Sequence, residues 1–190
     1  MAEALEGALL EGYSYRRLRA ADGDTYAVLR REMLRDAPES FLGAPDEDPG
    51  TRPEVNRERF EHAFDRVLGV HDPEGALVAS AALVRDAREK LRHKGLIVSV
   101  YTAPPARRRG FQRLLLEVLL EHARKAPGLD VVQLSVSADA PGAQALYESL
   151  GFRAWGREPR ALRIDGADHD EIHMSMDVDM ARTDGEIVTG

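Results

Sequence analysis

The chain has 190 residues, of which 43% are hydrophobic and 31% charged, and its formal net charge is -7. These values are ordinary for one soluble globular domain with a sizeable core, and the acidic balance argues against a nucleic-acid partner, which would require a basic face. The absence of cysteine excludes disulfides, thiolate metal sites and any mechanism that holds an acyl group on a cysteine thiol.

The start of the chain lacks the basic segment of a signal peptide. Glu3 and Glu6 are there, and no Lys or Arg precedes Arg16. No apolar run approaches the roughly 20 residues needed to span a bilayer. We therefore expect a cytoplasmic protein with no membrane partner.

Hydrophobic periodicity and turn residues predict five segments in the first part of the chain. In order, these are an N-terminal lead-in over residues 1–12 that is expected to be flexible, a strand over 13–18, a helix from Asp22 or Asp24 to about Pro38, a loop over 41–53 and a helix over 54–65, with Val55, Phe60 and Phe64 available for the core.

The second part alternates strands and helices. Its sequence pattern predicts a hairpin of strands 67–71 and 76–84, a strand over 95–101, a helix from Phe111 and a strand over 131–137. It then predicts a short helix from Pro141 closed by Gly151, strands over 152–155 and 171–178, and a polar tail over 179–190. This order predicts one mixed α/β domain, residues 13–178, with helices on a central sheet.

The junction between the strand over 95–101 and the next helix is locally basic. Arg107, Arg108, Arg109 and Arg113 lie within seven residues and no acidic residue stands among them, against the negative charge of the whole chain. A helix N-terminus offers unpaired N–H groups and the positive end of the helix dipole, so it favours an anion. Gly110 lets the backbone approach that anion closely. The junction therefore predicts a phosphate site.

Two motifs at and after this junction resemble the GNAT superfamily of N-acetyltransferases. The segment from Arg107 to Gln112 resembles the acyl-CoA signature [RQ]-x-x-G-x-[GA]. Downstream, AQALYESLGF over residues 143–152 resembles the family pattern A-x-x-L-Y-x-x-x-G-F. Two motifs in the right order, separated by a helix and a strand, are more specific than either alone. The resemblance covers roughly residues 13–178.

The resemblance implies a fold, a co-substrate and site residues. The fold would be a single α/β domain of the α+β type, with a central mixed, mostly antiparallel twisted sheet flanked by helices. Acetyl-CoA would be the co-substrate, with no metal, and the tyrosine of the second motif, Tyr147, would protonate the departing CoA thiolate. The residues implied in acetyl-CoA binding are Val100, Tyr101, Thr102, Arg107, Arg108, Arg109, Gly110, Phe111, Gln112 and Arg113.

Three positions differ from the family pattern. Gln112 stands where Gly or Ala is usual, and Ala140 aligns with an Asn that often precedes the second motif. On the strand before the signature, Ser99 is the one polar side chain, so the glutamate base of protein-lysine members has no counterpart there. The base would then be a carboxylate or histidine from elsewhere acting through water, unless the amine arrives deprotonated.

The sequence leaves three functions to be weighed. The first is an acetyl-CoA-dependent N-acetyltransferase that modifies the primary amine of a small molecule by direct transfer in a ternary complex. The second is a protein lysine or N-terminal acetyltransferase, and the third a non-catalytic acyl-CoA-binding sensor or assembly subunit. A homodimer is compatible with the resemblance, since family members often dimerise.

Two charged segments have simpler interpretations. The acidic run from Asp46 to Asp48 could attract a cationic amine, but charge runs are more often solvated loops. The segment His169 to His173 suggests a metal cluster at first sight, yet a polar start to a strand accounts for it, and we expect no metal there.

Overall fold

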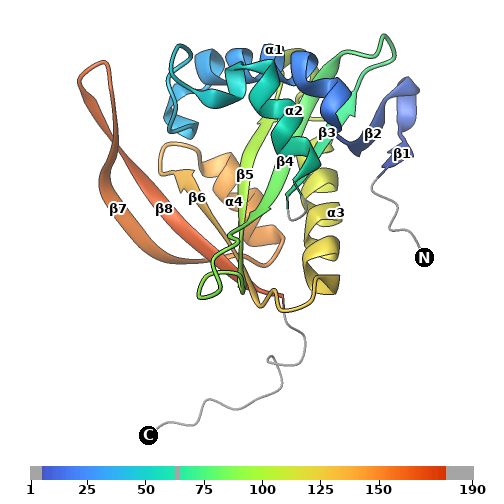
Figure 1. The fold of residues 1–190 in the computed structure, drawn as a ribbon. Coiled ribbons are helices and arrows are strands. Elements are labelled where there is room, and N and C mark those ends of the chain that lie inside the picture. The colour runs from blue at the N-terminus through green and yellow to red at the C-terminus, as the bar shows by residue number, and fades with distance from the viewer. Residues whose placement is uncertain (1–5, 63–64, 179–190) are drawn as a thin grey trace, which may run out of the picture.

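The computed structural model describes residues 6–62 and 65–178, whose strands form one continuous sheet in the order β1-β2-β3-β4-β5-β6-β8-β7 (Figure 1). The strands are β1 (Glu6–Ala8), β2 (Ser14–Arg17), β3 (Arg66–His71), β4 (Leu77–Arg85), β5 (Lys94–Thr102), β6 (Val131–Ser137), β7 (Arg153–Ile164) and β8 (Ala167–Asp177). All neighbouring pairs are antiparallel except β5 and β6, which run parallel. This is the mixed, mostly antiparallel sheet expected from the sequence.

The helices cover both faces of the sheet. They are α1 (Gly23–Asp36), α2 (Pro53–Glu61), α3 (Phe111–Lys125) and α4 (Pro141–Ser149). Neighbouring strand residues separate into two hydrophobic clusters: Val67 packs with α1 and α2, whereas Leu68 packs with α3 and α4. Side chains alternate across a strand, so α1 and α2 lie on one face and α3 and α4 on the other. None of the helices described is long and apolar enough to cross a membrane.

The amphipathic pattern of α3 explains its position. Its buried residues recur at helical spacing, and Leu115, Leu116 and Leu119 are fully buried. They pack on the same face of the sheet as Leu134 and Met174. The core therefore fixes α3 against the strands, and the start of α3 lies where β5 ends.

The sheet is split between β5 and β6. These two strands pair only from Lys94 to Leu96 with residues 131–133, and no further pairing continues along β5. Beyond Leu96, the side of β5 that faces β6 lacks a strand partner. A gap between parallel strands of this kind exposes backbone N–H and C=O groups that a ligand can use.

A bulge lies on β5 at the open part of the split. The register with β4 shifts between Ser80 and Ala82, which pair with Tyr101 and Val98. Ser99 adopts a left-handed φ of 57° inside the bulge, and its carbonyl accepts a 2.9 Å hydrogen bond from Ser80 Oγ. A bulge bends its strand and re-aims neighbouring groups, here toward the split.

The terminal elements differ most from the sequence expectations. Residues 6–12, which we assigned to the lead-in, form β1 and a short 3-10 turn. Strand β7 has 12 residues rather than the four predicted over 152–155, because its pairing with β8 continues past Pro159 through register shifts. Pro159 in a single sequence argues against a strand, whereas an edge strand tolerates it. Helix α2 ends at Glu61, and Phe64 and the tail over 179–190 lie outside the described residues.

One buried cluster gives a pH prediction for stability. His71 is 7% exposed, and Arg16 donates to its Nε2 at 3.2 Å while pairing with Asp22 at 2.7 Å. Burial, and then the charge of Arg16, lower the pKa of His71, so the folded protein keeps this imidazole neutral.

The imidazole of the unfolded chain takes up a proton near pH 6.5, so the free energy of unfolding should fall as pH drops below about 6.5. Thermal unfolding between pH 8 and 5.5 tests this, and His71→Gln should show a weaker pH dependence than the parent. Equal dependence would contradict the assignment.

Candidate active site

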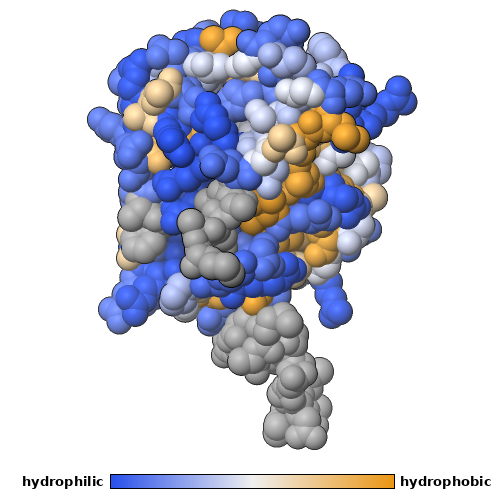
Figure 2. Space-filling model, turned by 90° about the vertical axis from the view of Figure 1, so that its right-hand side faces the viewer, coloured by the Kyte–Doolittle hydropathy of each residue, from blue (hydrophilic) through white to orange (hydrophobic). Residues whose placement is uncertain are grey.

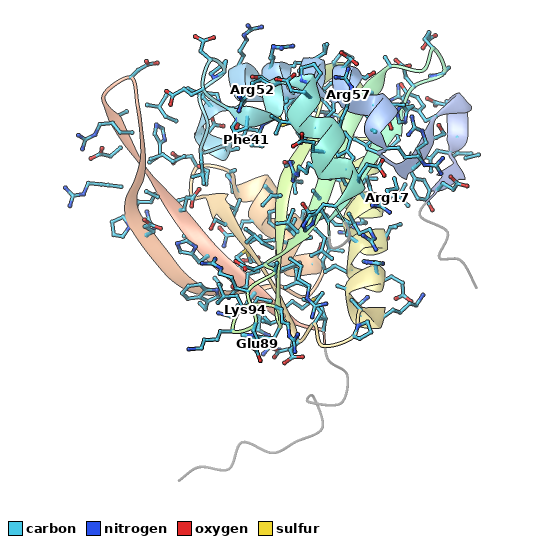
Figure 3. The ribbon with its side chains drawn as sticks, viewed as in Figure 1. Arg17, Phe41, Arg52, Arg57, Glu89 and Lys94 are labelled. Carbon is cyan, nitrogen blue, oxygen red and sulfur yellow. The ribbon has the colours of Figure 1, made fainter. Side chains whose placement is uncertain are left out.

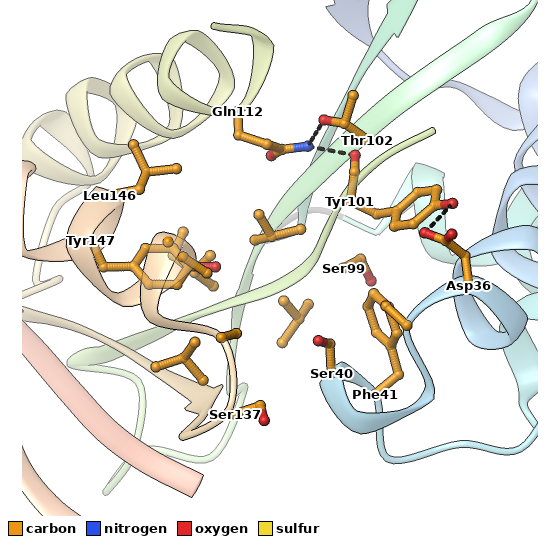
Figure 4. A pocket seen from close by; sticks show the side chains of 18 of the residues that line it. Asp36, Ser40, Phe41, Ser99, Tyr101, Thr102, Gln112, Ser137, Leu146 and Tyr147 are labelled. Atoms are coloured by element: carbon orange, nitrogen blue, oxygen red, sulfur yellow. Dashed lines mark hydrogen bonds between the residues drawn. The ribbon is translucent and has the colours of Figure 1, made fainter. Parts of the chain in front are cut away.

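A cavity of about 1110 Å³ occupies the split in the sheet (Figure 4). Its walls come from the α1–α2 connection, β5, the turn before α3, β6, α4 and one residue of β8. Tyr147 on its wall belongs to the hydrophobic cluster of α3 and α4, whereas Tyr101 belongs to that of α1 and α2. The cavity therefore connects the two faces of the sheet, and two reactants can approach from opposite sides.

The phosphate site predicted at the start of α3 has the geometry for an anion. Gly110 stands at the N-cap with a left-handed φ of 79°, and no atom lies within 4 Å of where a Cβ would be. Arg108 also has a left-handed φ, of 63°. The first N–H groups of α3 have no partner within the helix, so they point at this open space. A phosphate group can be bound there by backbone donors.

The four arginines of the junction differ in their partners. Arg107 forms an ion pair with Asp36, Arg109 with Glu11, and Arg113 donates to Ser149 Oγ at 2.7 Å. Within the described residues, Arg108 has no ion-pair partner, and it is exposed. The local positive charge is thus partly neutralised, and Arg108 is the cation available to a ligand.

Gln112, which departs from the family pattern, turns away from the phosphate site. Its Nε2 donates to the carbonyl of Tyr101 and to Thr102 Oγ1, the latter at 2.8 Å (Figure 4). It also lies 3.3 Å from the carbonyl of Ser80. The side chain therefore fastens the first turn of α3 to the ends of β5 and β4. The open space above Gly110 stays free.

Tyr147 lies on α4 with its hydroxyl toward the cavity (Figure 4). The residue is 5% exposed, and its ring packs edge-on against Phe152 at 6.0 Å between centroids. Burial raises the pKa of Tyr147 to about 12. The hydroxyl is therefore protonated at physiological pH and able to donate a proton.

Val100, Tyr101 and Thr102, at the end of β5, line the cavity. The Tyr101 side chain points into the other hydrophobic cluster, and its hydroxyl donates to Asp36 Oδ2 at 3.1 Å. Burial, followed by the charges of Glu32 and Asp36, raises the pKa of Tyr101. Val100 lines the split next to the bulge at Ser99. Their role in binding acetyl-CoA, which the family resemblance implies, stays a prediction.

The connection between α1 and α2 forms a wall of the cavity on the face opposite Tyr147. Arg30 donates to both oxygens of Asp48, at 3.0 and 2.6 Å, and both side chains are nearly buried. Arg30 also lies 5.0 Å from the centroid of the ring of Phe41, which belongs to the α1–α2 connection (Figure 3) and lines the cavity. Asp48 is therefore a structural anchor. The interpretation of this acidic run as a solvated loop fits only Asp46 and Glu47, which are exposed.

The wall formed by β6 and β8 is polar. Ser135, Ser137 and Glu171 line the cavity there. Leu134 and Met174, their neighbours along the two strands, face the α3 and α4 cluster, so the polar residues face the other side. Sequence reasoning did not identify these three as site residues, although the alternation of polar and apolar residues over 131–137 marks the polar face.

The histidines near the C-terminus do not form one cluster. His169 lies 2.9 Å from Asp139, and Asp170 is paired with Arg157 at 2.7 Å. His173 uses both ring nitrogens in hydrogen bonds, to Ser135 Oγ and to Glu158 Oε2. One polar atom each of Glu158, Glu171 and His173 lies within 4.8 Å of the other two, a spacing that could hold a metal ion, so the absence of a metal stays a prediction.

The split sheet, its bulge and the open helix start define an acyl-CoA-dependent acyltransferase. The sequence supports this class independently: residues 26–152 match the model of the acetyltransferase (GNAT) family. The chain is 43% identical over 151 residues to the N-alpha-acetyltransferase RimI of Mycobacterium tuberculosis, covering 80% of this chain and 85% of that protein.

Two further relatives are also acetyltransferases. The chain is 29% identical over 153 residues to the mycothiol acetyltransferase of Salinispora tropica, covering 79% of this chain but only 48% of that relative, so it spans about half that protein's length. A phosphinothricin acetyltransferase from Sinorhizobium meliloti, solved with acetyl-CoA, has the same fold with a TM-score of 0.77, 19% identity and coverage of 93% and 94%.

The chain therefore belongs to the GNAT family, and it is an N-acetyltransferase. Enzymes of this family use acetyl-CoA as the acetyl donor.

Proposed function

We propose that the enzyme transfers the acetyl group of acetyl-CoA to the primary amine of a small molecule, by direct attack in a ternary complex. The observation that carries this proposal is the cavity through the split sheet, with the open start of α3 on one side and a wall anchored by Arg30 and Asp48 on the other. A wall anchored by a nearly buried ion pair favours a small acceptor over a long polypeptide segment.

The residues present fit acetyl-CoA. The turn from Arg107 to Arg113 and the first N–H groups of α3 would hold the pyrophosphate, as the family resemblance implies. The backbone of Val100 to Thr102, which has no strand partner on the side of β6, would hydrogen-bond the pantetheine arm and the acyl carbonyl. Bound acetyl-CoA supplies a thioester that an amine can attack. Tyr147 would then give its proton to the departing thiolate sulfur.

A polypeptide N-terminus is the second candidate acceptor. The specific observation in its favour is the 43% identity to a protein named N-alpha-acetyltransferase. Both candidates are primary amines, so both fit a cavity whose acceptor side is lined by Glu171 and Glu39. The two differ in the size of the group that bears the amine, which the α1–α2 connection would have to accommodate.

A thiol-release assay with a panel of acceptors tests the proposal and separates the two candidates. The panel contains small primary amines and, as matched compounds, short peptides with free or blocked N-termini. We expect turnover with small amines. Turnover confined to peptides with free N-termini would favour the second candidate, and no thiol release with any amine would overturn both.

Charge reversal at Arg108 should weaken acetyl-CoA binding. Arg108→Glu replaces the unpaired cation beside the helix start, so we expect the Kd measured by calorimetry to rise about 10-fold, with a smaller rise at high salt. Lys90→Glu is a matched control, because it makes the same charge change on the exposed β4–β5 connection, near Glu89 and Lys94 (Figure 3). Equal affinities in the two variants would contradict the phosphate site.

A further inference from the structure

A chain of hydrogen bonds leads from the cavity to the outer strands of the sheet. Ser135 Oγ, on the cavity wall, lies 2.8 Å from Nδ1 of His173 on β8. Nε2 of the same ring lies 3.0 Å from Glu158 Oε2 on β7. The three residues therefore connect in the order serine, histidine, carboxylate, and only the serine lines the cavity.

The partners fix the tautomer of His173. A carboxylate only accepts hydrogen bonds, so the bond to Glu158 requires a proton on Nε2 of the neutral ring. Nδ1 then has a lone pair and accepts from the hydroxyl of Ser135. This orientation leaves His173 ready to take a proton from the direction of the cavity.

Acidic and aromatic side chains surround the ring of His173. The polar atoms of Glu158 and Glu171 that face His173 lie within 4.8 Å of it and of each other. Trp155 stacks on the imidazole at 5.2 Å between centroids, with 25° between the planes. The ring that would receive the proton therefore lies beside two carboxylates and an aromatic face. Glu171 itself lines the cavity, where it also attracts a cationic acceptor.

We propose that Ser135, His173 and Glu158 form the proton relay that deprotonates the acceptor ammonium group. The amine gives a proton to Ser135 Oγ while the Ser135 hydroxyl proton passes to Nδ1 of His173. The acceptor becomes a neutral nucleophile, His173 gains one positive charge, and the total charge is unchanged. Glu158 is a positioning residue that sets the ring's tautomer. The relay supplies the base that β5 lacks, and it rests on the proposed amine acceptor.

Kinetics across pH test the relay. His173→Gln should lower turnover about 100-fold at pH 7, a loss typical of a missing general base, and the deficit should shrink to within about 3-fold at pH 10, where much of the amine is already neutral. Ser135→Ala should follow the same profile. His169→Gln is the matched control, because it lies on the same strand but pairs with Asp139. A His173→Gln deficit that is equal at both pH values, or no deficit, would overturn the relay.

A second measurement does not depend on turnover. In the ¹⁵N-labelled protein, the imidazole signals that His173→Gln removes should show the neutral ring protonated on Nε2. A proton on Nδ1 would overturn the relay even if no amine proved to be a substrate, whereas absence of any acetylation would overturn the proposed acceptor alone. Activity that EDTA abolishes and Zn²⁺ restores would assign the cluster to a metal and would also overturn the relay.

Discussion

Tyr147→Phe should lower turnover about 100-fold while leaving the Kd for acetyl-CoA within about 3-fold. The hydroxyl lines the cavity and is protonated at physiological pH, so it has a proton to give where the resemblance puts the departing thiolate. The change keeps the ring and its packing on Phe152. Loss of activity would then come from the missing proton donor and not from a collapsed site.

Steady-state kinetics measure the turnover, and calorimetry measures the Kd for acetyl-CoA. Tyr26→Phe is the matched control: Tyr26 is fully buried in the α1 and α2 cluster, and its hydroxyl has no hydrogen-bond partner among the described residues. Removing that hydroxyl should leave turnover unchanged and should not destabilise the fold. Unchanged turnover in Tyr147→Phe would remove Tyr147 from the mechanism.

Local patterns were sufficient to predict the helices α3 and α4. The periodicity from Phe111 predicts α3, and its buried leucines confirm that face. Pro141 opens α4 and Gly151 follows it with a left-handed φ of 102°, as predicted. These features depend on residues close in sequence, so a single sequence contains the information. The roles of the site residues remain predictions.

The polar wall formed by β6 and β8 could not be predicted, because it depends on contacts between distant segments. The register of β6, β7 and β8 brings together Ser135, Glu158 and His173, which are far apart in sequence. The register shifts in β7 that extend this strand past Pro159 leave no local signal. The inward turn of Gln112 likewise requires knowing where the ends of β4 and β5 lie.

A run of charged residues does not show which of them are buried or paired, because this too depends on contacts between distant segments. The acidic run Asp46 to Asp48 has one composition but two environments, since Asp48 is buried against Arg30 and its two neighbours are exposed. The arginine turn shows the same division between paired and unpaired members. An exposed pair contributes little to stability, whereas a buried pair is costly to break. Exposed and buried ion pairs can be told apart only when the fold is known.

Asp48→Asn should therefore have the largest effect on stability among these variants, lowering the free energy of unfolding by about 3 kcal/mol. The amide keeps the shape of the side chain but leaves the charge of Arg30 unpaired where the two side chains are 12% and 8% exposed. Although burial acts in the opposite direction, the hydrogen bond from Arg30 holds the pKa of Asp48 below its ordinary value, so the wild-type pair is ionised. Denaturant unfolding measures the change.

Asp48→Asn should also raise the KM for the acceptor more than the KM for acetyl-CoA. Arg30 and Asp48 anchor the connection that bears Phe41, so its loosening should raise the KM for the acceptor while the KM for acetyl-CoA stays within about 2-fold. Asp86→Asn, in the exposed pair with Arg88, is the matched control and should change neither stability nor KM. The double variant Arg30→Met with Asp48→Leu should recover part of the lost stability, because it removes the unpaired charge. If Asp48→Asn matched the parent in stability, or raised both KM values equally, the wall would not depend on this pair.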